Sequence, residues 1–191
     1  MLTNLPNLLT LARIVLIPLI VAAFFAPGDA AHWLALGLFA IAGATDYFDG
    51  RIARARNQQT AFGRFLDPVA DKLLVAAVVL MMVAQGWIAG WLVLPALVIL
   101  LREILISGLR EFLAGMSVDV PVSRLAKWKT AVQFLALALL LVGAAGGTAL
   151  GELAAAALWI AAGFTLLTGF DYLRAGLRHI AQADADQVAQ R

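Results

Sequence analysis

Long apolar runs alternate with short polar segments along this chain. Six apolar blocks can be distinguished, at residues 8–25, 31–45, 73–87, 91–101, 131–145 and 153–170. Within each block apolar residues follow one another directly, without the 3.6-residue spacing of an amphipathic soluble helix. A helix needs about 20 residues to cross a bilayer, so we expect most blocks to continue as helix into neighbouring charged sequence. The pattern predicts an all-α, polytopic membrane protein with six transmembrane helices.

Helix-breaking residues separate these blocks. Pro27 and Gly28 close the first block, and Gly86 and Gly90 bracket the turn before the fourth. We expect the second helix to run to about residue 56, the third to start near 62, the fourth to run to about 113 and the fifth to start near 123. The sequence therefore predicts a single transmembrane domain over residues 1–178, followed by a polar cytoplasmic tail over 179–191 that frays.

The composition supports a membrane protein. Of the 191 residues, 63% are hydrophobic and 14% are charged, whereas soluble domains are about half apolar and about a quarter charged. A very apolar soluble bundle is the alternative, and the long apolar blocks disfavour it. The absence of cysteine excludes a disulfide framework and a cysteine-ligated metal. The N-terminus lacks a basic segment and a cleavage pattern, so we expect no cleaved signal peptide.

The basic residues predict the orientation of the chain. All 14 Lys and Arg residues fall in the N-terminal segment, the second–third connection, the fourth–fifth connection or the C-terminal segment. With six spans these regions lie on one side of the membrane, which the positive-inside rule makes cytoplasmic. We therefore expect both termini in the cytoplasm and the chain in the cell inner membrane. Trp33, Trp87 and Trp91 would lie at the opposite rim.

Aspartates gather at the facing ends of the second and third helices. Asp46 and Asp49 are three residues apart, so they share one helix face with Gly50 and Ala53. The third helix carries a matching row with four-residue spacing, formed by Gly63, Asp67 and Asp71. If the two faces oppose one another, four carboxylates converge beside a gap.

Four ionised carboxylates in a small space require counter-charge. Two divalent cations would supply it, and carboxylate-only ligation suits Mg²⁺ or Mn²⁺. A pair of such ions can clamp a phosphorus centre during displacement, while Arg54 could hold phosphate oxygens. The alternative is that these aspartates are interfacial charges paired with nearby basic residues, namely Arg51, Arg54, Arg56, Arg64 and Lys72.

The full pattern resembles the signature of the CDP-alcohol phosphatidyltransferases. It reads Asp46-x₂-Asp49-Gly50-x₂-Ala53-Arg54-x₈-Gly63-x₃-Asp67-x₃-Asp71, and the six-helix layout is also similar to that family. The resemblance implies a two-metal enzyme in which the hydroxyl of an acceptor alcohol displaces CMP from CDP-diacylglycerol. It further implies a homodimer.

The resemblance also implies roles for individual residues. One metal ion would be held by Asp46, Asp49 and Asp67, and the other by Asp46, Asp67 and Asp71. Asp71 would also be the general base. Gly50, Arg54 and Thr60 would contact the cytidine diphosphate. Further candidates for CDP binding, from their positions in the sequence, are Ala53, Gly63, Asn7 and Thr10. Within the first apolar block, Arg13 either extends to the lipid head groups or faces the site.

The acceptor is suggested by the later cytoplasmic segments. REILISGLREFLA and KWKTAVQ resemble the branch of the family that makes phosphatidylglycerol phosphate from sn-glycerol 3-phosphate. Basic residues there suit an anionic acceptor, and the candidates for binding its phosphate are Arg110, Lys127, Arg102 and Lys129. Alternatively, such cations attract anionic lipids, and Arg124 fits either role.

Two other functions remain open from the sequence. A sister enzyme would use phosphatidylglycerol, serine or inositol phosphate as the acceptor. A divalent-cation transporter would use the aspartates as a translocation site, although transporters place such sites near the bilayer midplane. The expected partners are therefore CDP-diacylglycerol, sn-glycerol 3-phosphate and membrane lipids, with no nucleic acid.

Overall fold

The computed structural model describes residues 4–55, 60–116, 118, 124–143 and 148–189. Over this part of the chain the fold is all-α, as predicted, with six α-helices and one short 3₁₀ turn. The helices are α1 (Leu5–Ala23), α2 (Ala30–Ala55), α3 (Ala61–Ala84), α4 (Val93–Gly115), α5 (Arg124–Gly143) and α6 (Thr148–Ala189), with the turn η1 (Gly90–Leu92) before α4. The four helix ends predicted at charged sequence lie within two residues of their expected positions.

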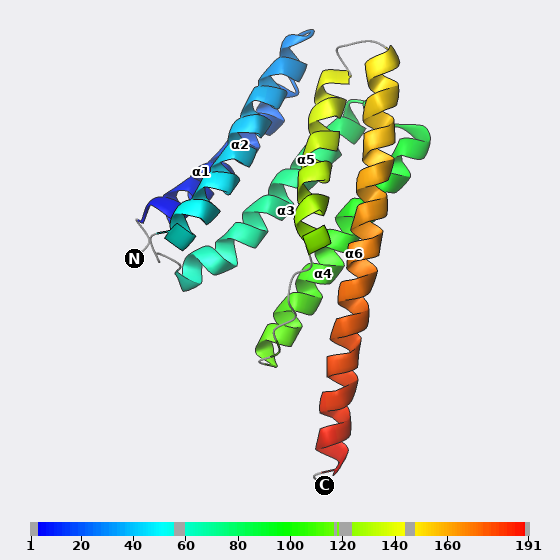
Figure 1. Cartoon of the computed structure of the whole chain (residues 1–191). Helices are drawn as coiled ribbons and strands as arrows, with labels where there is room; N and C mark the ends of the chain where they lie inside the picture. The colour runs from blue at the N-terminus through cyan, green and yellow to red at the C-terminus, as the bar shows by residue number, and fades with distance from the viewer. Residues whose placement is uncertain (1–3, 56–59, 117, 119–123, 144–147, 190–191) are drawn as a thin grey trace.

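The helices form two groups joined by α3 (Figure 1). In the first group α1 packs against both α2 and α3, and in the second α6 packs against both α4 and α5. Contacts of α2 with α5 and of α3 with α4 connect the groups. The start of α1, the end of α2 and the start of α3 all lie at one end of the first group, at the lower left of α1 and α2 in Figure 1. This shared end is where the acidic motif falls.

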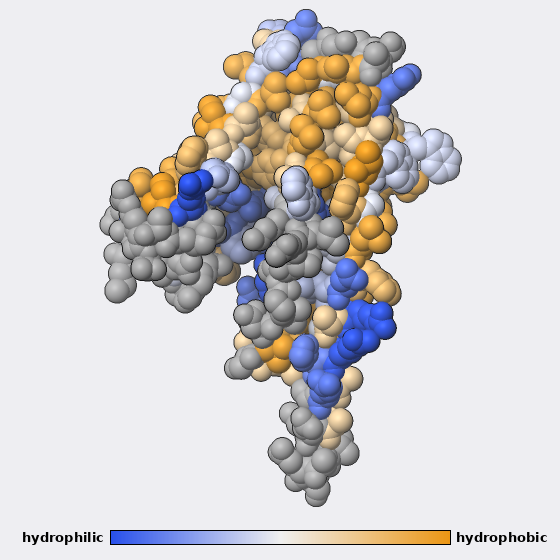
Figure 2. Space-filling view, viewed as in Figure 1, coloured by the Kyte–Doolittle hydropathy of each residue, from blue (hydrophilic) through white to orange (hydrophobic). Residues whose placement is uncertain are grey.

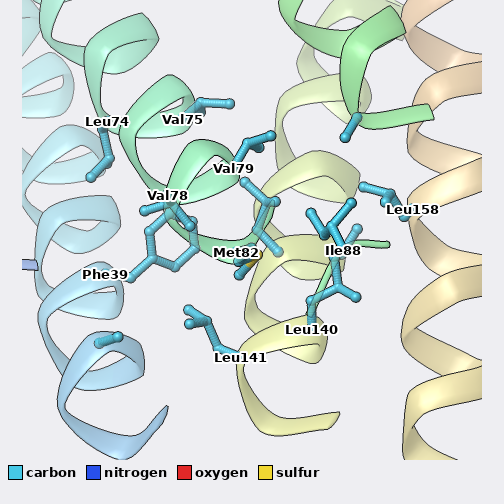
Figure 3. Close-up of a cluster of buried hydrophobic side chains, with 14 of the residues drawn as sticks. Phe39, Leu74, Val75, Val78, Val79, Met82, Ile88, Leu140, Leu141 and Leu158 are labelled. Atoms are coloured by element: carbon cyan, nitrogen blue, oxygen red, sulfur yellow. The ribbon is translucent and has the colours of Figure 1, made fainter. Parts of the chain in front are cut away.

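A shared apolar core holds the two groups together. Phe39 of α2 stacks on Phe134 of α5 with ring centroids 5.0 Å apart, and Gly43 lies against the same Phe134 ring. Figure 3 shows side chains from α2, α3 and α5 converging in this core, among them Phe39, Leu74, Val78, Met82 and Leu141. Burial of these side chains fixes the position of α3 between the two groups.

The surface has the apolar character of a membrane protein. Many large apolar side chains point outward, such as Val15, Leu80, Trp91 and Leu167. Within the described residues, three helical stretches are long and apolar enough to cross a membrane, namely Leu5–Ala23, Gly90–Gly115 and Leu150–Gln182. Figure 2 shows apolar residues over the upper part of this face and hydrophilic residues gathered lower down. The chain is therefore a helical membrane protein.

The C-terminal segment differs from the expectation of a frayed tail. Helix α6 continues without a break through residues 179–189 and extends beyond the end of α4 (Figure 1). This segment contains several Ala and Gln residues, which favour helix, and neither Gly nor Pro. The tail is polar, as predicted, but it is helical.

Candidate functional site

Two capped helix starts meet at the acidic end of the bundle. The Asn4 side chain accepts a hydrogen bond from the Asn7 backbone N–H at the start of α1, and Thr60 Oγ1 accepts one from the Gly63 N–H at the start of α3. Thr60 also donates to Asn7 Oδ1 across 3.1 Å, which ties the two starts together. Because helix starts carry partial positive charge, this end favours an anionic group such as a diphosphate.

Gly63 has a clear packing role at this junction. A Cβ at this position would lie 2.7 Å from Asn7 Oδ1 and 3.3 Å from Thr60 Oγ1. The missing side chain is therefore what allows α1 to approach the first turn of α3. Gly63, itself a candidate CDP-binding residue, therefore also lets two other candidates, Asn7 and Thr60, meet.

Arg13 of α1 lies between the two acidic helices. Its Nη1 is 3.1 Å from Asp46 Oδ1 on α2 and 2.7 Å from Asp71 Oδ1 on α3. The Arg13 side chain is completely buried, whereas the Asp46 and Asp71 side chains keep 34% and 33% of their surface exposed. The structure thus answers the question that the sequence left open, because Arg13 faces the acidic site and not the lipid head groups.

A third aspartate contacts the same face of α1. The Thr10 hydroxyl, one turn before Arg13, donates to Asp67 Oδ1 across 2.5 Å. Asp46, Asp67 and Asp71 therefore all contact one face of α1. Among the side chains described, no group of three acidic or imidazole residues already has the arrangement of a metal site.

The donors at this site nevertheless fit hard divalent cations. Asp46 and Asp71 from different helices already share one positive group, the Arg13 guanidinium. The oxygen-only donor set matches Mg²⁺ or Mn²⁺ better than Zn²⁺. Asp49, Gly50, Ala53 and Arg54 belong to the last turns of α2, but their side chains lie outside the described residues. Their assignments stay predictions.

A separate polar cluster lies between α4, α5 and α6. Glu103 Oε1 accepts from Arg102 Nη1 at 3.3 Å and also from Lys129 Nζ. Arg102 also donates to Thr168 Oγ1 on α6 at 3.1 Å, and its side chain packs against Gly169. Two of the four predicted acceptor-phosphate residues, Arg102 and Lys129, therefore have partners within the protein.

Two other cations near this cluster, Lys72 and Arg110, contact side chains that are not carboxylates. Lys72 donates to Ser107 Oγ on α4. Arg110, one turn after Ser107, is exposed, and its guanidinium carbon lies 5.7 Å from the centre of the Tyr172 ring. Among the described residues neither forms an ion pair with a carboxylate. Lys127 lies in the first turn of α5, and its side chain is outside the described residues.

The step from Asp71 to Lys72 connects the two clusters. Successive helix residues point in directions about 100° apart, so Asp71 reaches Arg13 on α1 while Lys72 reaches Ser107 on α4. The sequence analysis treated Lys72 only as a possible ion-pair partner for the aspartates. Its position directly after the last motif aspartate was the available signal for a role between the clusters.

Comparison with known proteins defines the class to which this architecture belongs. Residues 3–167 match the CDP-alcohol phosphatidyltransferase family, which covers most of the chain, and the chain belongs to that family. The oxygen-only acidic site and the capped helix starts described above fall within the matched region. The acidic motif was therefore a correct guide to the family.

Individual relatives are similar over nearly their whole length. A protein of Rickettsia felis is 48% identical over 177 residues, which cover 90% of this chain and 94% of the relative. A protein of Pseudomonas fluorescens is 45% identical over 181 residues, covering 93% and 92%. One of Pectobacterium atrosepticum is 46% identical over 178 residues, covering 92% and 96%. All three carry the name CDP-diacylglycerol–glycerol-3-phosphate 3-phosphatidyltransferase.

Proposed function

We propose that this protein transfers the phosphatidyl group of CDP-diacylglycerol to sn-glycerol 3-phosphate. The products are phosphatidylglycerol phosphate and CMP. The names of relatives at 45–48% identity support this acceptor. The observation that carries the proposal is the convergence of Asp46, Asp67 and Asp71 from two helices onto Arg13 and Thr10 of a third.

The chemistry follows from the acidic residues. Asp46, Asp49, Asp67 and Asp71 would hold two divalent cations, Mg²⁺ or Mn²⁺, which neutralise the diphosphate and polarise the reacting phosphorus. Asp71 takes the proton of the acceptor hydroxyl as the new oxygen–phosphorus bond forms. The phosphorus–oxygen bond to CMP breaks, and CMP leaves with that electron pair. The cytidine diphosphate is surrounded by the predicted CDP-binding residues, namely Asn7, Thr10, Gly50, Ala53, Arg54, Thr60 and Gly63.

The acceptor phosphate is bound on the other side of α3. Arg110 and Lys127, from α4 and α5, remain the leading candidates, and the contact of Lys72 with Ser107 adds Lys72 to them. Arg102 and Lys129 contribute less directly, because Glu103 is shared between them. On this arrangement Asp71 and Lys72 approach the acceptor from adjacent residues of α3, while Arg110 and Lys127 approach it from α4 and α5.

The enzyme assay tests the reaction itself. We expect radiolabel from sn-glycerol 3-phosphate to enter lipid only when CDP-diacylglycerol is present, with CMP released in equal amount. EDTA should abolish transfer, and Mg²⁺ or Mn²⁺ should restore it. Preferential transfer to phosphatidylglycerol, serine or inositol phosphate would instead assign a sister activity. Metal uptake into vesicles without CMP release would support a transporter.

The proposed orientation has six spans, cytoplasmic termini and a cytoplasmic site in the inner membrane. The one-sided distribution of Lys and Arg supports it. Because the chain has no cysteine, single cysteines can report the side of the membrane. In intact cells an impermeant maleimide should label Asp29→Cys, and it should label Gln182→Cys only after lysis. The reverse pattern would overturn the orientation.

The assembly proposed for the protein is a homodimer. Its support is the family to which the chain belongs. Chemical crosslinking of the purified protein in detergent, together with its light-scattering mass, should give twice the mass of one 20.3 kDa chain. A mass of one chain at all protein concentrations would contradict the proposal.

A further inference from the structure

Arg13 is a fully buried cation on an otherwise apolar stretch of α1. Through Nη1 it forms one ion pair with α2 and one with α3. Thr10 adds a hydrogen bond from the same face of α1 to Asp67. Helix α1 therefore touches three of the four motif aspartates, although it contributes no residue to the acidic motif.

The charges explain why such a residue is needed. Carboxylates on facing helices repel one another, and a partly dry environment strengthens that repulsion. A guanidinium between them offsets the repulsion, and its Nη1 contacts one oxygen of each carboxylate. Arg13 depends on the carboxylates in turn, because a buried cation without partners is strongly unfavourable.

We propose that Arg13 is a positioning residue that holds Asp46 and Asp71 in place before divalent cations bind. The inference rests on the proposed function, since it takes these aspartates as the metal-binding residues. Arg13 supplies in the metal-free protein part of the positive charge that the metal ions supply later. The stability gained from metal binding is accordingly smaller with Arg13 present than without it.

Two other roles for Arg13 fit the structure less well. An arginine that extends to lipid head groups keeps its guanidinium at the interface, whereas the side chain of Arg13 has no exposed surface. An arginine that binds substrate directly would offer its donors to the site opening, whereas Nη1 of Arg13 faces Asp46 and Asp71.

Thermal unfolding of the purified protein in detergent tests this role without relying on activity. Wild type, Arg13→Met, Arg13→Lys and Arg51→Met would each be freed of metal with EDTA and then measured with and without Mn²⁺. Arg51 is a matched control because it is an exposed arginine on α2 that donates to the Tyr47 hydroxyl at 2.8 Å. A midpoint that rises with Mn²⁺ in wild type reports the metal site.

We expect Arg13→Met to lower the midpoint of the metal-free protein by about 5 °C or more. Mn²⁺ should then raise its midpoint by more degrees than it raises that of wild type. The metal-free midpoint of Arg13→Lys and its rise with Mn²⁺ should fall between those of wild type and Arg13→Met. The ammonium keeps the positive charge but lacks the fixed donor geometry of the guanidinium. Arg51→Met should stay within about 1 °C of wild type under both conditions.

Four results would overturn the inference. An equal loss for Arg13→Met with and without Mn²⁺ would mean that Arg13 contributes packing only. An unchanged metal-free midpoint with a raised KM for CDP-diacylglycerol would make Arg13 a substrate ligand. If Arg13→Met does not fold, an Mn²⁺ shift in Arg13→Lys no larger than in wild type would count equally against it. No Mn²⁺ shift in wild type would overturn the metal site itself, and this inference with it.

Discussion

The two charged clusters of this protein use opposite charges in the same arrangement. Between α1, α2 and α3, one buried cation, Arg13, is shared by Asp46 and Asp71. Between α4, α5 and α6, one carboxylate, Glu103, is shared by Arg102 and Lys129. In each cluster the shared residue carries the minority charge.

The difference between the clusters lies in the sign of the charge left over. Among the side chains that the structure describes, the first retains more carboxylates than cations, so it suits divalent cations and the diphosphate that they bind. The second retains more cations than carboxylates, with Lys72 and Arg110 beside it, so it suits an anionic acceptor. A minority charge at the centre keeps like charges close enough together to act on one ligand.

Loss of Asp71, the proposed general base, should give the largest effect. We expect Asp71→Asn to lower kcat by about 10³-fold, because the amide neither accepts the proton nor matches the charge of a metal ligand. Transfer of labelled sn-glycerol 3-phosphate into lipid measures it. Asp171→Asn, at an exposed aspartate of α6, is the control and should retain wild-type activity. A comparable loss in both variants would contradict a specific role for Asp71.

Removal of the minority charge from the basic cluster should destabilise the fold. Glu103→Gln leaves Arg102 and Lys129 without their shared carboxylate, at a cost of about 3 kcal/mol, or roughly 6 to 12 °C in the unfolding midpoint. The exposed Glu111 of α4 provides the matched control, Glu111→Gln. Equal midpoints for the two variants would mean that Glu103 is not central to its cluster.

Arg110 and Lys72, which lie beside the basic cluster, should affect only the KM for the acceptor. Arg110→Ala and Lys72→Met should each raise the KM for sn-glycerol 3-phosphate by about 10-fold, the value expected for one charged hydrogen bond. The KM for CDP-diacylglycerol should stay constant. Arg174→Ala, at an exposed arginine of α6, controls for general surface charge. An unchanged KM for the acceptor would remove both residues from the phosphate site.

The smallest effect concerns the junction of α1 and α3. Gly63→Ala places a Cβ 2.7 Å from Asn7 Oδ1 and should cost about 1 kcal/mol of stability, because this oxygen is the end of a side chain that can shift. Gly108→Ala, in α4 with open space around it, should instead gain about 0.5 to 1 kcal/mol. Denaturation midpoints distinguish the two. A stabilised Gly63→Ala variant would show that the junction adjusts freely.

The sequence predicted the acidic cluster better than the basic one. Asp46 lies three residues from Asp49 on one helix, and Asp67 lies four residues from Asp71 on the next, so helix periodicity indicated one acidic face on each helix. The role of Arg13 remained undecided because periodicity places a side chain on a face without identifying the helix opposite. The pairing of Glu103 with Lys129 joins residues on different helices, and only tertiary packing decides which such side chains meet.

Helix α3 carries Asp71 and Lys72 on a single rigid axis. Any rotation about that axis moves the carboxylate away from Arg13 and the ammonium away from Ser107 in the same motion. On the proposed function, the contacts of Asp71 with the metal site and of Lys72 with the acceptor would therefore change together. If a change in bilayer thickness tilts or rotates α3, the binding of both substrates should weaken together. The turnover rate should therefore depend on the length of the lipid acyl chains.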